Sequence, residues 1–156
     1  MASAHDQIRN LIHRYAEGID TGRFEIWEEL FEHAEIYFTI GESEPTLLAS
    51  GGDLSVMTQG IIIYGDGTPR TRHLVSNTII EVDEAGGKAT ARSYNTTLQQ
   101  VPGRPIEIIA TARYFDSFEL DGNSWRFTQR IIRHSAIDGI NRDFTGDMSH
   151  HVRRQG

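Results

Sequence analysis

The chain has 156 residues, of which 38% are hydrophobic and 24% are charged, a balance typical of one folded globular domain. Its net charge of -7 at pH 7 disfavours nucleic acid as a partner, because phosphates bind basic surfaces. The absence of cysteine excludes disulfides, thiolate nucleophiles and cysteine metal sites. No apolar run reaches the ~20 residues of a membrane-spanning helix. Residues 1–6 also lack the features of a secretory signal, so we expect a cytoplasmic protein with no membrane partner.

The first predicted element is an amphipathic helix. Ser3, with Asp6 three residues later, resembles a capping box, and Gly18 and Gly22 indicate where the helix should end. Apolar side chains repeat at helical spacing and form one stripe, which consists of Ile8, Leu11, Ile12, Tyr15, Ala16 and Ile19.

Shorter elements follow this helix. Residues 24–31 repeat the helical spacing, and residues 35–40 predict a first strand. Residues 53–59 predict a short helix between glycines. Residues 65–69 have the composition of a loop, so the segment between residues 41 and 70 has little predicted regular structure.

The second half of the chain has the pattern of long strands. They are rich in β-branched or aromatic residues and span 74–82, 89–101, 106–120 and 125–137. Their short connections imply antiparallel hairpins, since parallel pairing needs a crossover of a dozen or more residues. Helices followed by a meander predict an α+β domain, in which the helices cover one face of a curved, mostly antiparallel sheet. We place this domain at residues 1–140 and a polar tail at residues 141–156.

Three residues are candidates for chemistry. Tyr15, Asp20 and His73 supply an aromatic hydroxyl, a carboxylate and an imidazole, which suffice for proton transfer without a cofactor. A buried Tyr15 hydroxyl needs a partner, either a carbonyl substrate or a backbone carbonyl of the core. Asp20 could cap the helix that begins near Arg23, or it could orient the His73 imidazole. A lone strand histidine is more often structural than catalytic, and its combination with Tyr15 and Asp20 favours the catalytic interpretation.

Four further polar residues are predicted to bind substrate. Asn77 shares the strand alternation of His73. Asn95 and Arg113 lie in the middle of strands, and His134 follows two strand arginines. We expect no metal, because no His-x-His or His-x3-His pair occurs. We also expect no cofactor, since there is neither a Gly-x-Ser-x-Gly elbow nor a phosphate-binding glycine loop.

Several segments together carry a family resemblance. Residues 8–20 and 27–31 resemble the opening of SnoaL-like proteins in the nuclear transport factor 2 superfamily. Residues 72–77 resemble the histidine strand of that group, and residues 113–116 with 122–127 resemble its last hairpin. The resemblance implies a cone-shaped fold made by a bent sheet and covering helices.

Within this superfamily the chain is similar to scytalone dehydratase and bile-acid 7α-dehydratase. In those enzymes a tyrosine and an aspartate of the first helical region meet a strand histidine in a conical pocket. By motif position, the resemblance implies these roles for Tyr15, Asp20 and His73. It also implies a homo-oligomer, with a trimer favoured over a dimer. The chain differs from the family at residues 33–34, which read His-Ala where Asp-Ala is common, and residues 42–66 carry no family pattern.

The resulting functional hypothesis is a cofactor-independent lyase (dehydratase) or isomerase acting on a hydrophobic, carbonyl-bearing small molecule. The alternative is a non-catalytic ligand-binding or assembly module of the same fold, including a role like that of the small subunit of ring-hydroxylating dioxygenases. Ketosteroid isomerase shares the fold but needs an aspartate base near the first strand. Residues 37–41 contain no aspartate, which disfavours that activity.

Overall fold

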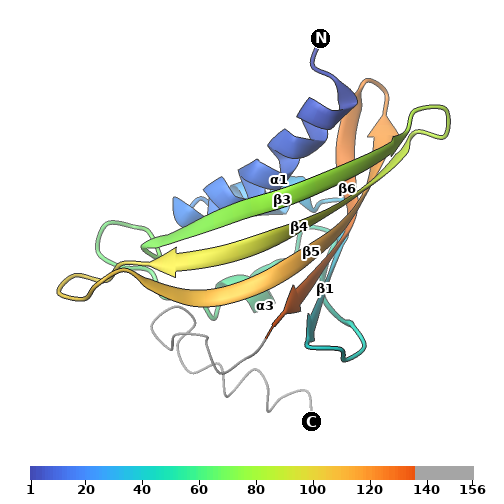
Figure 1. The fold of residues 1–156 in the computed structure, drawn as a ribbon. Helices are drawn as coiled ribbons and strands as arrows, with labels where there is room; N and C mark the ends of the chain where they lie inside the picture. The colour runs from blue at the N-terminus through green and yellow to red at the C-terminus, as the bar shows by residue number, and fades with distance from the viewer. Residues whose placement is uncertain (136–156) are drawn as a thin grey trace.

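A single six-stranded sheet organises residues 1–135, the part of the chain that the computed structural model describes (Figure 1). The elements in chain order are α1 (Ala4–Asp20), α2 (Glu25–Leu30), β1 (Glu35–Ile40), β2 (Thr46–Ser50), α3 (Ser55–Thr58), β3 (Thr71–Asp83), β4 (Lys88–Gln99), β5 (Glu107–Asp121) and β6 (Ser124–His134). The strand order is β2-β1-β6-β5-β4-β3, and every pair is antiparallel except β1 with β6. This arrangement confirms the predicted α+β class, with an open sheet rather than a closed barrel.

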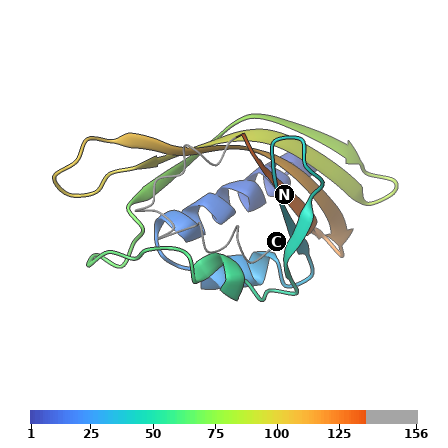
Figure 2. The same ribbon diagram turned by 90° about the horizontal axis from the view of Figure 1, so that it is seen from below.

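The helices cover one face of the curved sheet. Seen from below, the sheet arches over α1, and α2 and α3 lie on the other side of α1 (Figure 2). The apolar stripe of α1 is buried as its periodicity predicts, except for the half-buried Leu11, and Ile8 and Ile12 are fully inaccessible. The indole Nε1 of Trp27 donates to the backbone carbonyl of Tyr15 at 2.8 Å and so fastens α2 to α1.

Ser3 and the two glycines predicted to bound α1 have different roles in the structure. Ser3 caps the helix start, where its Oγ accepts from the Asp6 amide at 3.2 Å. Gly22 follows the helix end with φ of 69°, a conformation that favours glycine. Gly18, in contrast, lies inside α1, and a Cβ there would stand 3.2 Å from the Ile26 side chain. Gly18 therefore permits close helix packing and does not end the helix.

The predicted elements recur in the structure with two differences. The sequence pattern does not predict β2, an edge strand in which only Ala49 is buried, so it lacks the alternation of a half-buried strand. β3 begins at Thr71 rather than at residue 74. The predicted strand end at residue 137 and the predicted tail at 141–156 lie outside the described residues. Within residues 1–135, no helix is long and apolar enough to cross a membrane.

A buried ion pair lies in the middle of the core. Nε and Nη2 of Arg130 each donate to an Asp116 carboxylate oxygen at 2.7 Å, and both side chains are fully inaccessible to solvent. The guanidinium stands 4.2 Å from the ring centroids of both Tyr15 and Tyr114. Burial disfavours the cation, but the Asp116 carboxylate outweighs this and raises the pKa of Arg130. The pair thus places a permanent positive charge beside the Tyr15 ring.

Breaking this pair should destabilise the fold strongly. Asp116→Ala would leave a buried guanidinium without its counter-ion, and we expect the free energy of unfolding to fall by about 3–5 kcal/mol. Lys88→Ala is the matched control, because the Lys88–Glu119 pair is exposed and its loss should cost less than about 1 kcal/mol. Urea denaturation followed by circular dichroism measures both. Equal losses in the two variants would contradict a structural role for the Arg130–Asp116 pair.

Candidate active site between the first helix and the third strand

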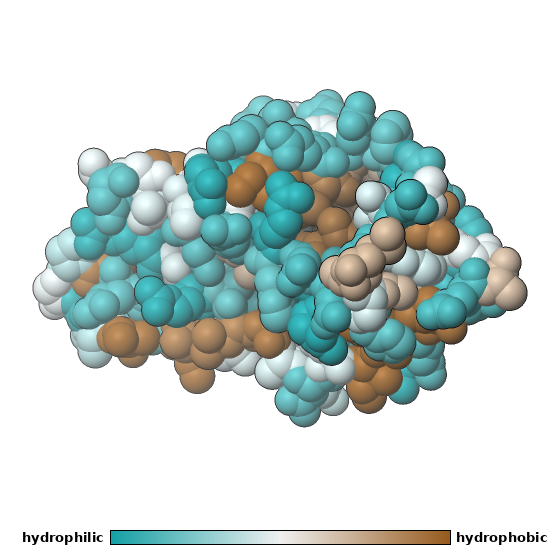
Figure 3. Space-filling view, turned by 90° about the horizontal axis from the view of Figure 1, so that it is seen from above, coloured by the Kyte–Doolittle hydropathy of each residue, from teal (hydrophilic) through white to brown (hydrophobic). Residues whose placement is uncertain are grey.

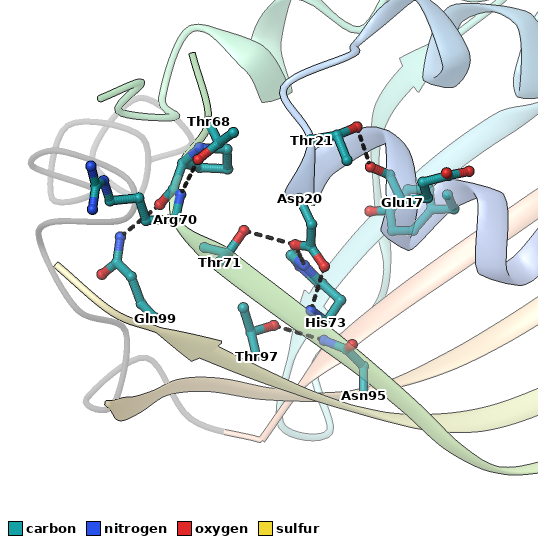
Figure 4. A network of polar contacts seen from close by, with 12 residues as sticks. Glu17, Asp20, Thr21, Thr68, Arg70, Thr71, His73, Asn95, Thr97 and Gln99 are labelled. Carbon is teal, nitrogen blue, oxygen red and sulfur yellow. Dashed lines mark hydrogen bonds and ion pairs between the residues drawn. The ribbon is translucent and has the colours of Figure 1, made fainter. Parts of the chain in front are cut away.

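The Asp20 carboxylate connects the end of α1 to the start of β3. Its Oδ1 accepts from the Thr71 hydroxyl at 2.8 Å and lies 2.7 Å from Nδ1 of His73 (Figure 4). Its Oδ2 accepts from the His73 backbone amide, also at 2.7 Å. The capping alternative does not hold, because the N-cap residue of α2 is Phe24, without a side-chain cap hydrogen bond. The structure therefore brings Asp20 and His73 together.

Both members of this pair are shielded from solvent. The His73 side chain is 6% exposed and that of Asp20 is 19% exposed. Burial by itself raises the pKa of Asp20, but the hydrogen bonds and the charge of His73, together with the Thr71 hydroxyl, outweigh it and lower the pKa. Asp20 is therefore a carboxylate at neutral pH. It can fix the orientation of the imidazole and stabilise a positive charge on it.

Tyr15 is packed into an aromatic cluster of the core. Its ring stacks on Trp27 with a centroid distance of 5.0 Å, and the residue is 3% exposed. Burial raises the pKa of Tyr15 to about 12, and the Asp20 charge adds to this, whereas the Arg130 cation acts in the opposite direction. The Tyr15 hydroxyl therefore keeps its proton at neutral pH and can donate a hydrogen bond.

Two of the predicted substrate-binding residues lie on the inner, helix-covered face of the sheet. Asn95 and Thr97 stand on β4 next to His73, with Thr97 directly opposite it in the strand register (Figure 4). Asn95 is 4% exposed, and its Nδ2 donates to the Thr97 hydroxyl at 3.0 Å. His134 lies at the end of β6, where its ring is 5.2 Å from that of Phe38. Asn95 and His134 therefore share the side of the sheet that carries His73.

The other two predicted substrate-binding residues lie away from the Asp20–His73 pair. The ladder between β3 and β4 shifts register between Ser76 and Ile79, and Asn77 has a φ of 53°. This bulge interrupts the alternation on which the prediction depended, and Asn77 is exposed. With Arg113, it lines a shallow pocket of about 80 Å³ on the outer face of the sheet. The Arg113 guanidinium lies there over the ring of Tyr94, at 5.4 Å from its centroid.

The sequence pattern did not single out Thr71 and Thr97. Thr71 stands two residues before His73, so a strand extended to residue 71 would have placed both on one face. Thr97 stands two residues after Asn95 and shares its face for the same reason. Within the described part of the chain, no group of three or more His, Cys, Asp or Glu side chains could hold a metal ion.

The sequence of this chain matches the SnoaL-like domain over residues 1–131. The chain belongs to the SnoaL-like family. No curated protein matches it. The family assignment agrees with the geometry, since residues 1–131 contain α1, the Asp20–His73 pair and nearly all of the sheet.

Solved structures of nuclear transport factor 2-like proteins share the fold of this SnoaL-like chain. A proposed scytalone dehydratase from Novosphingobium aromaticivorans has a TM-score of 0.60 and 23% identity, covering 84% of this chain and 83% of the other. The beta subunit of a proposed aromatic-ring-hydroxylating dioxygenase from the same organism has a TM-score of 0.67 and 21% identity, with coverage of 85% and 90%. A third N. aromaticivorans protein, NTF2-like with a cystatin-like fold, has a TM-score of 0.60 and 20% identity, with coverage of 83% and 80%.

Removing the Asp20 charge should make stability less dependent on pH. Because the pKa of Asp20 is lowered on folding, its contribution is fully present above the ordinary value of 3.8 and is lost as the pH falls through the folded-state value. We expect Asp20→Asn to lower the free energy of unfolding at pH 7 by roughly 1.5–3 kcal/mol, the contribution of a hydrogen bond to a charged group. The difference from wild type should shrink in acid.

Urea denaturation at several pH values between neutral and acid measures this effect. Asp53→Asn serves as the control, since the exposed Asp53 accepts only local bonds from Ser55 and its loss should matter less. A difference that stays constant or grows as the pH falls would show that the Asp20 charge does not stabilise the fold.

Proposed function

We propose that this SnoaL-like protein is a cofactor-independent dehydratase or isomerase that acts on a hydrophobic, carbonyl-bearing small molecule. The observation that carries the proposal is the 2.7 Å contact between the Asp20 carboxylate and Nδ1 of His73, made between two shielded side chains. A carboxylate that fixes Nδ1 also sets the direction of Nε2, the ring nitrogen that exchanges a proton with the substrate in this proposal.

The proposed reaction begins with proton removal. His73 takes a proton from the carbon beside the substrate carbonyl, and the electron pair of the broken C–H bond moves toward the carbonyl oxygen. Asp20 stabilises the imidazolium that forms, since a charged imidazole is costly in a buried site without a partner. Tyr15 donates a hydrogen bond to the developing enolate oxygen, and its pKa of about 12 keeps the proton on the hydroxyl.

The second half-reaction decides between the two products. When a hydroxyl group stands on the next carbon, the enolate re-forms its carbonyl and expels that hydroxyl, which takes the proton from His73 and leaves as water. When a carbon–carbon double bond stands next to the deprotonated carbon instead, the charge spreads over a dienolate. His73 then returns the same proton to the far carbon of that double bond, and the result is an isomerisation. Both outcomes conserve the oxidation state of the substrate, so neither requires a redox cofactor.

The comparison with solved structures supports a dehydratase in one respect. One neighbour of similar fold is a proposed scytalone dehydratase, a lyase that removes water. The Asp20–His73 pair provides the base that such a reaction requires. Asn95 and His134 lie on the same inner face and are the proposed substrate-binding residues of this site.

Variants of the pair and of Tyr15 should affect the chemical step. His73→Ala should abolish turnover while substrate binding stays largely intact. Tyr15→Phe should lower kcat by about 100- to 1,000-fold with little change in KM, the effect of losing one donor to a developing oxyanion. The measurement is a screen of hydroxy-ketones for loss of water by mass spectrometry, followed by kinetics on any substrate found. Full activity in His73→Ala would contradict the mechanism.

An assembly role is the second candidate, and the outer face of the sheet favours it. Large apolar side chains are exposed on β3, on β4, at the start of β5 and just before it, a pattern typical of interaction surfaces. They are Leu74, Ile79, Tyr94, Ile106 and Ile108. Figure 3 shows hydrophobic side chains gathered in patches along the lower margin of a mostly hydrophilic surface. We propose that copies of this chain associate through this outer face, as a trimer or a dimer.

Sedimentation tests the assembly. Ile108 is 64% exposed, so Ile108→Lys should leave the fold intact and shift the protein toward monomer. Leu120→Lys serves as the control, because Leu120 is also exposed but lies at the far end of β5. A wild-type protein that sediments as a monomer would contradict self-association, and co-purification with a large iron-containing chain would favour an oxygenase subunit instead.

A further inference from the structure

Several buried polar atoms in the described part of the chain lack a hydrogen-bond partner, and two of them stand in one row on the inner face of the sheet. These two are Oδ1 of Asn95 and Nδ1 of His134, and neither has a partner among residues 1–135. An unpaired polar atom in a protein interior costs about as much as a lost hydrogen bond, so native proteins keep few of them. Two such atoms near a candidate active site indicate a place where a ligand supplies the missing bonds.

The strand register places the two residues in one row across the sheet. Asn95 on β4 stands opposite Ala112 on β5, and Ala112 stands opposite His134 on β6. Neighbouring strands lie about 4.8 Å apart, so the two polar residues flank the small Ala112 side chain at a backbone separation of roughly 10 Å. The Ala112 side chain between them is a single methyl group, so no large side chain of β5 separates the two polar groups.

Both unpaired atoms are hydrogen-bond acceptors. The Asn95 amide already donates through Nδ2 to the Thr97 hydroxyl at 3.0 Å, and its remaining group is the carbonyl oxygen. Burial lowers the pKa of His134 to about 4, a backbone hydrogen bond with Thr111 opposes the shift, and the charge of His73 adds to it. The ring is therefore neutral at pH 7. A neutral imidazole has one N–H and one lone pair, and we assign the lone pair to the unpartnered Nδ1.

We propose that Asn95 and His134 line a second subsite, in which Nδ1 of His134 accepts a hydrogen bond from a substrate hydroxyl remote from the carbonyl that meets Tyr15 and His73. This inference rests on the proposed function and narrows its substrate class to ring ketones that carry a remote hydroxyl. A carbonyl, ether or carboxylate at the same position would face two acceptors and gain no hydrogen bond. The subsite therefore selects hydroxylated ligands over their methylated or deoxygenated analogues.

The position of the subsite relative to His73 fits a ligand that spans both. The charge of His73 acts on His134, so the two imidazoles lie within electrostatic reach of each other. His73 stands on β3, and Asn95 stands on the neighbouring β4 two residue pairs further along the ladder. A flat, ring-containing ligand lying across β3 to β6 would present its carbonyl to one end of this row and its hydroxyl to the other.

A matched pair of probes tests this selection without turnover. The probes are para-hydroxybenzophenone and para-methoxybenzophenone, which share a ring ketone and differ in whether the remote oxygen can donate. Isothermal titration calorimetry at pH 7 should give an affinity for the hydroxyl compound about tenfold higher, the effect of one buried hydrogen bond. Equal affinities, or binding of neither probe, would overturn the inference.

Two variants of His134 test whether this residue causes the preference for the hydroxyl probe. His134→Phe removes the acceptor and keeps a ring against Phe38, so the two probes should bind with equal affinity. His134→Gln retains an acceptor and should keep most of the preference, which separates loss of the acceptor from a defect in folding. His13→Phe, on the exposed face of α1, is the control and should bind as wild type does. A preference that survives in His134→Phe would overturn the assignment.

These experiments distinguish a failure of the proposed subsite from a failure of the proposed reaction. Hydroxyl selection that depends on His134 in a protein that turns over no hydroxy-ketone would contradict the catalytic proposal and leave the subsite standing. Turnover that depends on His73 without hydroxyl selection would contradict the subsite alone.

Discussion

The Asp20 carboxylate is the interaction on which the site depends. One side chain at the last residue of α1 receives the Thr71 hydroxyl, the His73 amide and the His73 ring, all within 2.8 Å. These bonds join segments more than fifty residues apart and fix where the first helix lies relative to β3. The same bonds lower the pKa of Asp20 against the effect of burial. The connection that holds helix to sheet therefore also supplies a fixed negative charge beside an imidazole.

The protein buries a second carboxylate for a different purpose. Asp116 and Arg130 are fully enclosed and joined by two short hydrogen bonds, so their charges satisfy each other. The Arg130 cation lies against the Tyr15 ring. It lowers the pKa of the Tyr15 hydroxyl and so opposes part of the increase that burial causes. An arginine stays protonated at any physiological pH, whereas an imidazole can both accept and give up a proton. The Arg130–Asp116 pair is therefore suited to a structural role beside the site, whereas the Asp20–His73 pair is suited to proton transfer.

The two faces of the sheet have different chemistry, and bulges decide which residue belongs to which face. The inner face carries Asn95, Thr97 and His134 among apolar residues, whereas the outer face carries exposed isoleucines and Arg113. The bulge after Ser76 separates Asn77 from the His73 side of the strand. A one-residue change of register exchanges the faces of every later residue, so a small local irregularity has a large effect on the composition of the site.

The sequence by itself determined the class of fold, because the helical stripe of α1 and the long alternating strands are local patterns that survive in any context. It also indicated Tyr15, Asp20 and His73, since a family pattern ties them together in the chain. Only the tertiary structure decided that Asp20 contacts His73 rather than capping α2, because both uses satisfy a carboxylate locally. It also decided that Asn95 and His134 share the inner face while Asn77 and Arg113 do not. Bulges and strand register, which depend on contacts between distant strands, set those positions.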